Sequence, residues 1–220
     1  MRISVLGASG RTGSAVVRRA REAGHEVTAV VREQSRLDED LHPEHVVAGR
    51  DWDATLLTRA VAGADAVAFC LGPVPGGPRT VQQDLVALTL AAMRETGTRR
   101  LAAISASGGV VDGDDPLSRY LAKPIISRLL RHAFADMAEM EARIRASDRD
   151  WTILRPPRLL DGPGRGRYRS RRDGNVRWSY SLARADLALA VLDAIADASS
   201  IGATISVAAG TPDSSAGAHR

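Results

Sequence analysis

The 220-residue sequence lacks several features on which common protein classes depend. Cys70 is its only cysteine, which excludes an intramolecular disulfide framework and a multi-cysteine metal site, so no metal is predicted. No apolar run reaches the roughly 18 residues of a membrane span. The apolar start at residues 3–6 is also too short for a signal peptide. We therefore expect a cytoplasmic protein without a membrane partner.

Aromatic residues make up only 4% of the chain, and its 30 basic residues include a single lysine, Lys123. Scarce aromatics argue against the stacking platforms that bind single-stranded nucleic acid. Because the formal net charge of +4 is also modest, a nucleic-acid partner is disfavoured. Arginine binds phosphate through a planar fork of donors, so the positions of the arginines matter more than their number.

Short apolar runs alternate with amphipathic segments along most of the chain. This alternation predicts βαβ units and a parallel sheet covered by helices on both faces. A glycine- and arginine-rich segment at 161–177 is predicted to be a loop or hairpin. Strands are expected at residues 2–6, 27–31, 46–47, 64–71, 100–105, 151–155 and 203–208, and helices around 14–24, 54–61, 79–95, 133–147 and 187–195.

A glycine-rich loop follows the first predicted strand and opens the first predicted helix. Its spacing, Gly7-x-x-Gly10-x-x-Gly13, is typical of a dinucleotide-binding loop. The three glycines allow, in order, a tight turn, close approach of a pyrophosphate and close packing of the helix on the strand. The helix N-terminus offers N–H groups to phosphates, and Ser9 and Thr12 add hydroxyl donors. A glycine-rich turn without a ligand is the alternative interpretation.

Basic residues follow the second predicted strand, where dinucleotide sites distinguish NAD from NADP. An acidic residue there binds the ribose 2′-hydroxyl of NAD, whereas an arginine accommodates the 2′-phosphate of NADP. Arg32 ends the strand, Arg36 lies one helical turn later, and Arg11 of the glycine loop could join them. This cluster favours NADPH over NADH, although Glu33 would permit NADH if it faced the ribose. A solvated surface pair is the alternative for Arg32 and Arg36.

Two further strand ends carry candidate cofactor contacts. Asp51 follows the third predicted strand, where a carboxylate can accept the adenine amino group, and Gly72 follows the fourth, where the backbone must pass close to the cofactor. Cys70 lies in the same apolar run as Gly72. We interpret it as a buried core thiol and not a nucleophile, because nothing nearby in sequence would lower its pKa.

Together these motifs resemble the atypical short-chain dehydrogenase/reductases, and most closely the NmrA-like and biliverdin-IXβ reductase/flavin reductase NAD(P)H-binding proteins. The resemblance rests on GASGRTG at 7–13, EVTAVVR at 26–32, SRL at 35–37, VAGADAV at 61–67, WTILRPP at 151–157 and RADL at 184–187. It spans nearly the whole chain. It is specific for fold and dinucleotide binding but not for substrate, because the group includes flavin and quinone reductases, biosynthetic reductases and nucleotide-sensing regulators.

The resemblance implies one Rossmann-type α/β domain over residues 1–210. Its doubly wound parallel sheet would carry helices on both faces and a small C-terminal substrate lobe. Substrate-cleft elements are expected at about 108–132 and 156–182, and a disordered tail at 211–220. The resemblance also assigns residues to each part of the cofactor. It places Gly10, Arg11, Thr12 and Gly13 at the pyrophosphate, and Arg32 and Arg36 at the 2′-phosphate. Leu71 and Gly72 would lie under the ribose, Ser105 or Ser107 near the nicotinamide, and Pro157 and Arg158 beside its carboxamide.

The Tyr-x-x-x-Lys pair of conventional members is missing. Lys123, the only lysine, lies three residues after Tyr120, so Tyr120 would contribute only if its loop placed it unusually. Ketone reduction benefits from a positioned acid, whereas a flavin or quinone delocalises the charge and takes its proton from solvent. Ser105, Ser107 and Tyr120 remain the polar candidates near the nicotinamide, and a structural cap at the sheet end is the alternative for the serines.

Some family members carry histidines in the helix before the strand at 151–155. This chain has Met137 and Glu141 at the corresponding positions, which weakens the case for a tetrapyrrole substrate. His132 could act as an acid if it reached the cleft, and the alternative is a position on a helix surface.

Residues 158–177 hold seven arginines against two aspartates, a formal charge of +5. They are interpreted as a lid that attracts an anionic or flat aromatic small molecule, or alternatively as a solvated hairpin or subunit contact. The sequence predicts an NADPH-dependent oxidoreductase that reduces a flavin, a quinone or a related conjugated molecule. The alternatives are a non-catalytic NADP(H)-sensing regulator and a tailoring enzyme that dehydrates, isomerises or reduces a polyketide-type intermediate.

Overall fold

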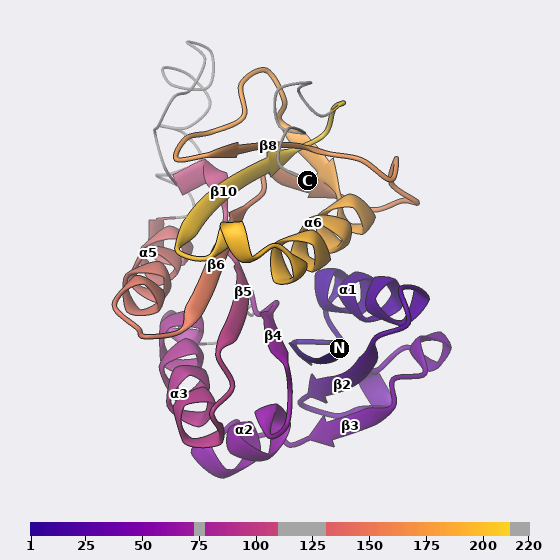
Figure 1. The fold of residues 1–220 in the computed structure, drawn as a ribbon, viewed down its shortest axis with the longest axis vertical. Coiled ribbons are helices and arrows are strands. Elements are labelled where there is room, and N and C mark those ends of the chain that lie inside the picture. The colour runs from indigo at the N-terminus through magenta and orange to yellow at the C-terminus, as the bar shows by residue number, and fades with distance from the viewer. Residues whose placement is uncertain (73–77, 110–130, 212–220) are drawn as a thin grey trace.

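A mostly parallel sheet forms the centre of the computed structural model, which describes residues 1–72, 78–109 and 131–211 (Figure 1). Within these residues the sheet has eight strands in the order β3-β2-β1-β4-β5-β6-β10-β8. Only β8 runs antiparallel to its neighbour, β10. The strands are β1 (Arg2–Leu6), β2 (Glu26–Val31), β3 (His45–Ala48), β4 (Ala66–Phe69), β5 (Arg100–Ile104), β6 (Asp150–Arg155), β8 (Arg169–Arg172) and β10 (Ala203–Ala208).

Helices cover both faces of this sheet (Figure 1). Helices α1 (Arg11–Glu22) and α6 (Arg184–Ala196) pack together on one face. Helices α2 (Ala54–Val61), α3 (Val81–Thr96) and α5 (Arg131–Arg145) cover the other. Each face has its own apolar core, the first with Val17 and Leu187 and the second with Leu57 and Met140. The predicted doubly wound α/β fold is therefore confirmed.

The first two helices follow the expected patterns. Helix α1 buries Val16, Val17 and Ala20 against the sheet. Helix α2 has the predicted bounds because Asp53 caps it: the Asp53 carboxylate accepts a hydrogen bond from the Leu56 N–H at 2.8 Å.

The segment after β6 is more structured than expected. β7 (Arg158–Leu160) pairs in parallel with β9 (Ser181–Ala183), and β8 joins the main sheet where a loop or hairpin was predicted. Conversely, β4 is shorter than the expected strand at 64–71, because the chain leaves the sheet before Leu71 and Gly72. Most of the expected cleft element at 108–132 and of the tail at 211–220 lies outside the described residues.

The strand order defines where a ligand can bind. Successive connections place β2 on one side of β1 and β4 on the other, so the sheet has its switch point between β1 and β4. A crevice forms there, at the carboxyl ends of the strands. None of the described helices is both long and apolar enough to cross a membrane.

Candidate dinucleotide-binding site

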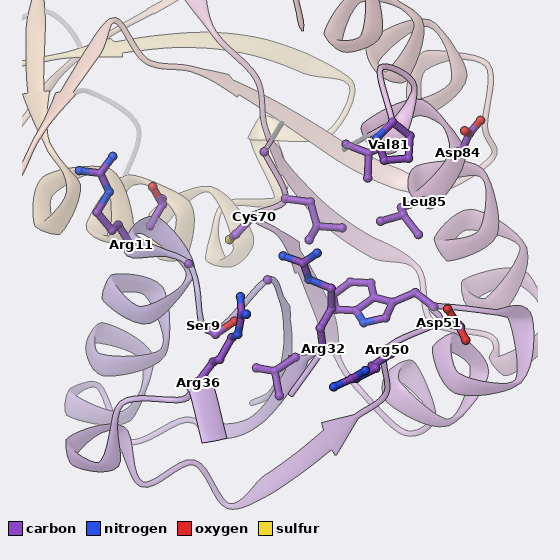
Figure 2. A pocket seen from close by; sticks show the side chains of 18 of the residues that line it. Ser9, Arg11, Arg32, Arg36, Arg50, Asp51, Cys70, Val81, Asp84 and Leu85 are labelled. Carbon is purple, nitrogen blue, oxygen red and sulfur yellow. The ribbon is translucent and has the colours of Figure 1, made fainter. Parts of the chain in front are cut away.

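A cavity of about 880 Å³ opens at the carboxyl ends of β1, β2 and β4, at the switch point of the sheet (Figure 2). Four loops form its wall: the glycine loop, the turn after β2, and the segments after β3 and β4. Its described lining is Gly7, Ser9, Gly10, Arg11, Thr12, Val31, Arg32, Arg36, Arg50, Asp51, Trp52, Asp53, Cys70, Leu71, Gly72, Pro78, Val81, Asp84, Leu85 and Arg184.

The glycine loop has the backbone geometry that its spacing predicts. Gly7 has a φ of +85°, a conformation that favours glycine. A Cβ atom at position 13 would lie 2.1 Å from the Gly7 carbonyl oxygen, so only glycine lets α1 approach β1 this closely. Gly13 is therefore buried beneath the loop and is not among the lining residues of the cavity.

The N-terminus of α1 faces this cavity, and no side chain among the described residues caps it. Gly10 is the N-cap, and the first turn of the helix contains no acidic residue. The unpaired N–H groups and the positive end of the helix dipole thus meet the space that Ser9 and Thr12 line. This arrangement suits a phosphate group.

Three arginines line the cavity near the end of β2. Figure 2 shows Arg32 and Arg36, the predicted pair, and Arg50 from the loop after β3. The Glu33 carboxylate binds the Arg36 Nε at 3.3 Å and the Arg50 guanidinium at 3.4 Å. Glu33 thereby pairs with arginines and is not among the lining residues. Arg32 has no ion pair with any described residue.

Arg11 does not join this cluster. Figure 2 shows its side chain directed away from Arg32 and Arg36. Its guanidinium instead binds the Asp161 carboxylate at 3.2 Å, and Asp161 also accepts a hydrogen bond from Arg184 at 2.6 Å. The expectation that Arg11 would gather with the other two arginines is therefore not met, because a carboxylate distant in sequence attracts it.

The opposite wall combines a carboxylate with apolar surface. Asp51 lines the cavity, as its predicted adenine contact requires. Trp52 lies beside it, packs partly against the second core, and buries an indole N–H without an acceptor among the described residues. Arg50, Trp52 and Arg184 also line the cavity, although no sequence motif assigns them a role. Arg50 and Trp52 directly adjoin Asp51 in the sequence, and this adjacency to a predicted site residue could have identified them.

Cys70 and Leu71 continue the wall after β4. Burial of the Cys70 thiol raises its pKa to about 12, so the thiol stays protonated at neutral pH. This agrees with the interpretation of Cys70 as a core thiol. The Leu71 carbonyl accepts a hydrogen bond from the Gln82 amide at 2.9 Å, which fixes the start of the Leu71–Gly72 segment against α3.

The residues expected near the nicotinamide gather at the carboxyl ends of β5 and β6. The Ser105 N–H donates to the Leu154 carbonyl at 2.8 Å, and the Ser107 N–H donates to the Pro156 carbonyl at 2.9 Å. Pro157 and Arg158 follow directly. None of Ser105, Ser107, Pro157 and Arg158 is among the described lining of the cavity, and Tyr120 lies outside the described residues. Their roles stay predictions.

Glu141 explains the environment of Ser105. Its buried carboxylate accepts hydrogen bonds from Arg155 Nε at 2.9 Å and Arg145 at 2.6 Å. Burial alone would raise the pKa of Glu141, but hydrogen bonds from Arg155 and Ser105 hold it below its ordinary value. The Ser105 hydroxyl is thus one of the groups that favour the ionised form of Glu141. His132 is exposed on the surface of α5, in agreement with the second interpretation, and its Nε2 lies 3.1 Å from the Arg79 guanidinium.

The parallel sheet, the glycine loop and the uncapped helix N-terminus define a dinucleotide-binding protein of the Rossmann class. Residues 7–198 match the model of the NAD(P)H-binding family. The chain belongs to this family and binds a nicotinamide dinucleotide, which confirms the predicted NAD(P)H-binding family.

Relatives with similar sequences and folds come from several bacteria. The Bacillus subtilis protein YwnB is 28% identical over 200 residues, which cover 88% of this chain and 91% of that protein. A short-chain dehydrogenase/reductase from Veillonella parvula, solved in complex with NADP, superimposes with a TM-score of 0.80 at 19% identity, covering 94% of each chain. SP1627 from Streptococcus pneumoniae, a proposed NADH-flavin reductase, gives a TM-score of 0.79 at 23% identity, covering 96% of this chain and all of that one. These two structures share the fold.

Proposed function

We propose that the protein is an NADPH-dependent oxidoreductase that transfers a hydride from the nicotinamide to a flavin, a quinone or a related conjugated small molecule. The carrying observation is the cluster of Arg32, Arg36 and Arg50 at one end of a dinucleotide cavity. The Veillonella parvula relative holds NADP, which agrees with the cofactor, and SP1627, a proposed NADH-flavin reductase, agrees with the acceptor but not with the choice of NADPH.

The charge distribution supports NADPH over NADH. Glu33 would bind a ribose 2′-hydroxyl only if its carboxylate were free, but it already pairs with Arg36 and Arg50. Arg32 lines the cavity without an ion-pair partner among the described residues. A 2′-phosphate supplies the acceptor oxygens that such a guanidinium lacks, and arginine binds phosphate through two parallel hydrogen bonds.

The lack of a Tyr-x-x-x-Lys proton donor supports an acceptor that needs little help from the protein in taking up a proton. When bound, the cofactor supplies the hydride, and the protein contributes mainly binding and orientation. The superfamily's Tyr-x-x-x-Lys pair is absent from the sequence. A conjugated acceptor tolerates this absence because it spreads the incoming charge over its rings. Ser105, Ser107 and Tyr120 are the proposed polar groups near the nicotinamide.

The remaining contacts of the cofactor are proposed from their positions. Leu71 and Gly72 would lie under the ribose and Asp51 beside the adenine, and all three line the cavity. Pro157 and Arg158 would lie beside the nicotinamide carboxamide.

Equilibrium binding of NADPH and NADH, followed by intrinsic tryptophan fluorescence, tests the cofactor assignment. The double variant Arg32→Ala/Arg36→Ala should bind NADPH about 100-fold more weakly, because it loses two charge-assisted contacts worth roughly tenfold each. Its affinity for NADH should change little. Arg59→Ala is the matched control, since Arg59 is exposed on α2 and does not line the cavity. Equal losses for both dinucleotides would contradict the 2′-phosphate assignment.

Turnover tests the oxidoreductase assignment separately. NADPH consumption should depend on an added acceptor when the protein is assayed against FMN, riboflavin and a panel of quinones. Tight NADPH binding without acceptor-dependent consumption across this panel would contradict the proposed activity and favour a cofactor-sensing role.

A further inference from the structure

One carboxylate holds two arginines that come from opposite ends of the chain. Asp161, directly after β7, binds Arg11 through Oδ2 at 3.2 Å and Arg184 through Oδ1 at 2.6 Å. Arg11 is the first residue of α1 and Arg184 the first residue of α6. Both arginines line the same cavity as Ser9 and Gly10 of the glycine loop.

Helix electrostatics do not favour these two positions for arginine. The first turn of a helix carries a partial positive charge and stabilises anions, not cations. Helix α1 has no acidic residue there. Helix α6 has Asp186, but the Asp186 carboxylate is buried and accepts the N–H groups of Arg165 and Gly166, each at 2.8 Å. Asp161 is thus the carboxylate that compensates both arginines among the described residues.

This compensation is incomplete and weak. The side chains of Arg11 and Asp161 are 73% and 67% exposed, and exposed pairs of this kind contribute at most about 1 kcal/mol. Arg184 is only 13% exposed, and its Nε is buried without an acceptor among the described residues. A pyrophosphate offers more charge and more acceptor oxygens than one carboxylate, so it can replace Asp161 with a gain in electrostatic energy.

We propose that Arg184 binds the phosphate oxygens of the dinucleotide beside Arg11, for which the family resemblance already implies this contact, and that Asp161 is an internal counter-ion which the cofactor displaces. The proposal deepens the proposed function, because it rests on dinucleotide binding in this cavity. It assigns to Arg184 a role for either nicotinamide dinucleotide, whereas the cluster around Arg32 selects between them.

The backbone around Asp161 permits a confined displacement. Gly162 follows with a φ of +130°, in the region that favours glycine. Two residues later, Gly164 packs against Asp186, where a Cβ atom would lie 2.7 Å from the Asp186 Oδ1. The bonds from Arg165 and Gly166 to Asp186 fix this part of the loop. Release of Asp161 would therefore move residues 161–163 and leave 164–166 in place.

Calorimetric titration of NADP⁺ and NAD⁺ tests the proposal on three variants and a control. Arg184→Ala should weaken both dinucleotides to the same extent, by about tenfold for one lost charge-assisted contact. Arg184→Lys keeps the charge and should recover part of this loss, which guards against a folding defect. Asp161→Asn should tighten both dinucleotides several-fold, because the displaced group no longer carries a charge. Arg167→Ala, an exposed arginine of the same segment, should change neither affinity.

The double variant Arg184→Ala/Asp161→Asn decides between competition and a purely structural role. If Asp161 competes for Arg184, the gain from Asp161→Asn should shrink in the Arg184→Ala background. Part of the gain should remain there, because Asp161 also pairs with Arg11. A weaker or unchanged affinity of Asp161→Asn, or a gain that is just as large without Arg184, would overturn the proposal.

Three further results distinguish failure of this proposal from failure of the proposed function. If the unmodified protein binds neither dinucleotide, the proposed function itself fails. If it binds NADP⁺ in preference to NAD⁺ but these variants change nothing, only the role of Arg184 and Asp161 fails. A loss confined to the KM for FMN, with riboflavin and NADP⁺ unaffected, would assign the two arginines to an acceptor phosphate and also overturn the proposal.

Discussion

At the scale of single residues, Cys70 lies on the wall of the cofactor cavity but has the chemistry of a core residue. Although the residue as a whole is only partly buried, enclosure of its thiol raises the pKa to about 12 from a reference value of 9.0. The thiolate is the reactive form of cysteine, so position beside a ligand does not make this side chain a nucleophile.

We expect Cys70 in the folded protein to react with iodoacetamide about 1000-fold more slowly than an ordinary cysteine at the same pH, in proportion to its smaller thiolate fraction. Intact-mass spectrometry over a time course measures the reaction. Guanidinium-unfolded protein is the control and should be alkylated at the ordinary rate. Rapid labelling of the folded protein would show an accessible thiolate.

Residues of the site differ in how far the sequence predicts them. The positions of Gly7 and Gly13 follow from backbone constraints that act within the loop, and the structure has the predicted geometry. The orientation of Arg11 could not be predicted, because it depends on Asp161, which is distant in sequence and adjacent only after folding. Long, exposed, charged side chains adopt the orientation that their tertiary neighbours select.

At the scale of elements, helix α5 caps helix α3. The buried Asp136 of α5 accepts hydrogen bonds from the N–H groups of Gln82 and Gln83, each at 2.9 Å. The N-cap residue of α3 itself, Thr80, makes no such bond through its side chain. Val81 and Leu85 of α3 line the cavity, whereas Asp136 does not. Asp136 therefore helps to fix one cavity wall from outside the cavity.

Asp136→Ala should destabilise the protein by about 2–3 kcal/mol, because two buried N–H groups lose a charged acceptor. Guanidinium unfolding curves measure the change, and cofactor affinity should fall with it. Glu139→Ala, an exposed change on the same helix, should stay within about 0.5 kcal/mol. Matching losses in the two variants would show that Asp136 does not act as a cap.

The ion-pair network of Glu141 predicts how stability depends on pH. Burial opposes ionisation of Glu141, but bonds from Arg155, Ser105 and Arg145 lower its pKa below the reference value of 4.5. A lowered folded-state pKa means that this stabilisation is complete above pH 4.5 and is lost as the pH falls through the folded value.

Glu141→Gln should therefore destabilise the protein by about 3 kcal/mol at pH 7, since it leaves the largely buried Arg155 without a charged partner. It should also flatten the loss of stability below pH 4.5. Unfolding curves at a series of pH values measure both effects. If the curves of the variant and the unmodified protein stayed parallel through this range, the network would not be the source of the pH dependence.

Helices and central strands were predictable because they carry apolar residues at helical spacing or short continuous apolar runs. Strand β8 does not: its sequence is Arg-Ser-Arg-Arg, without an apolar residue to mark an inward face. It becomes a strand because it pairs with β10, which is distant in sequence and adjacent only after folding. Strands β7 and β9 have three residues each, too few for a pattern.

At the scale of the whole molecule, the cavity joins segments from the first half of the sequence to Arg184 near its end. Ligands that bind only the folded state stabilise it by mass action, by about 2.7 kcal/mol at 100 times the Kd. For a chain of this size we expect saturating NADP⁺ to raise the Tm by roughly 5–10 °C.

NAD⁺ at the same concentration should raise the Tm less than NADP⁺, because it lacks the phosphate that the arginine cluster would bind. Differential scanning fluorimetry measures both shifts. In Arg32→Ala/Arg36→Ala the two shifts should become similar, whereas Arg59→Ala should preserve the difference. Equal shifts in the unmodified protein would contradict the selection of NADP.

The doubly wound fold and the phosphate-binding half of the site could be predicted because both depend on local signals, namely alternating elements and a spaced glycine motif. The nicotinamide side could not be built to the same depth. Its candidates, Ser105, Ser107, Pro157 and Arg158, come from two strand ends that are adjacent only in the folded sheet. Ser105 also influences the pKa of Glu141, which belongs to a third element.

The edge of the sheet at β8 also bears on how copies of this protein behave at high concentration. An edge strand has unpaired backbone groups that can template aggregation with another sheet. Here the edge consists of Arg169–Arg172, with three arginines in four residues. A second copy that paired along this strand would bring like charges together. The sheet therefore ends in a strand whose own charge keeps neighbouring molecules from extending it.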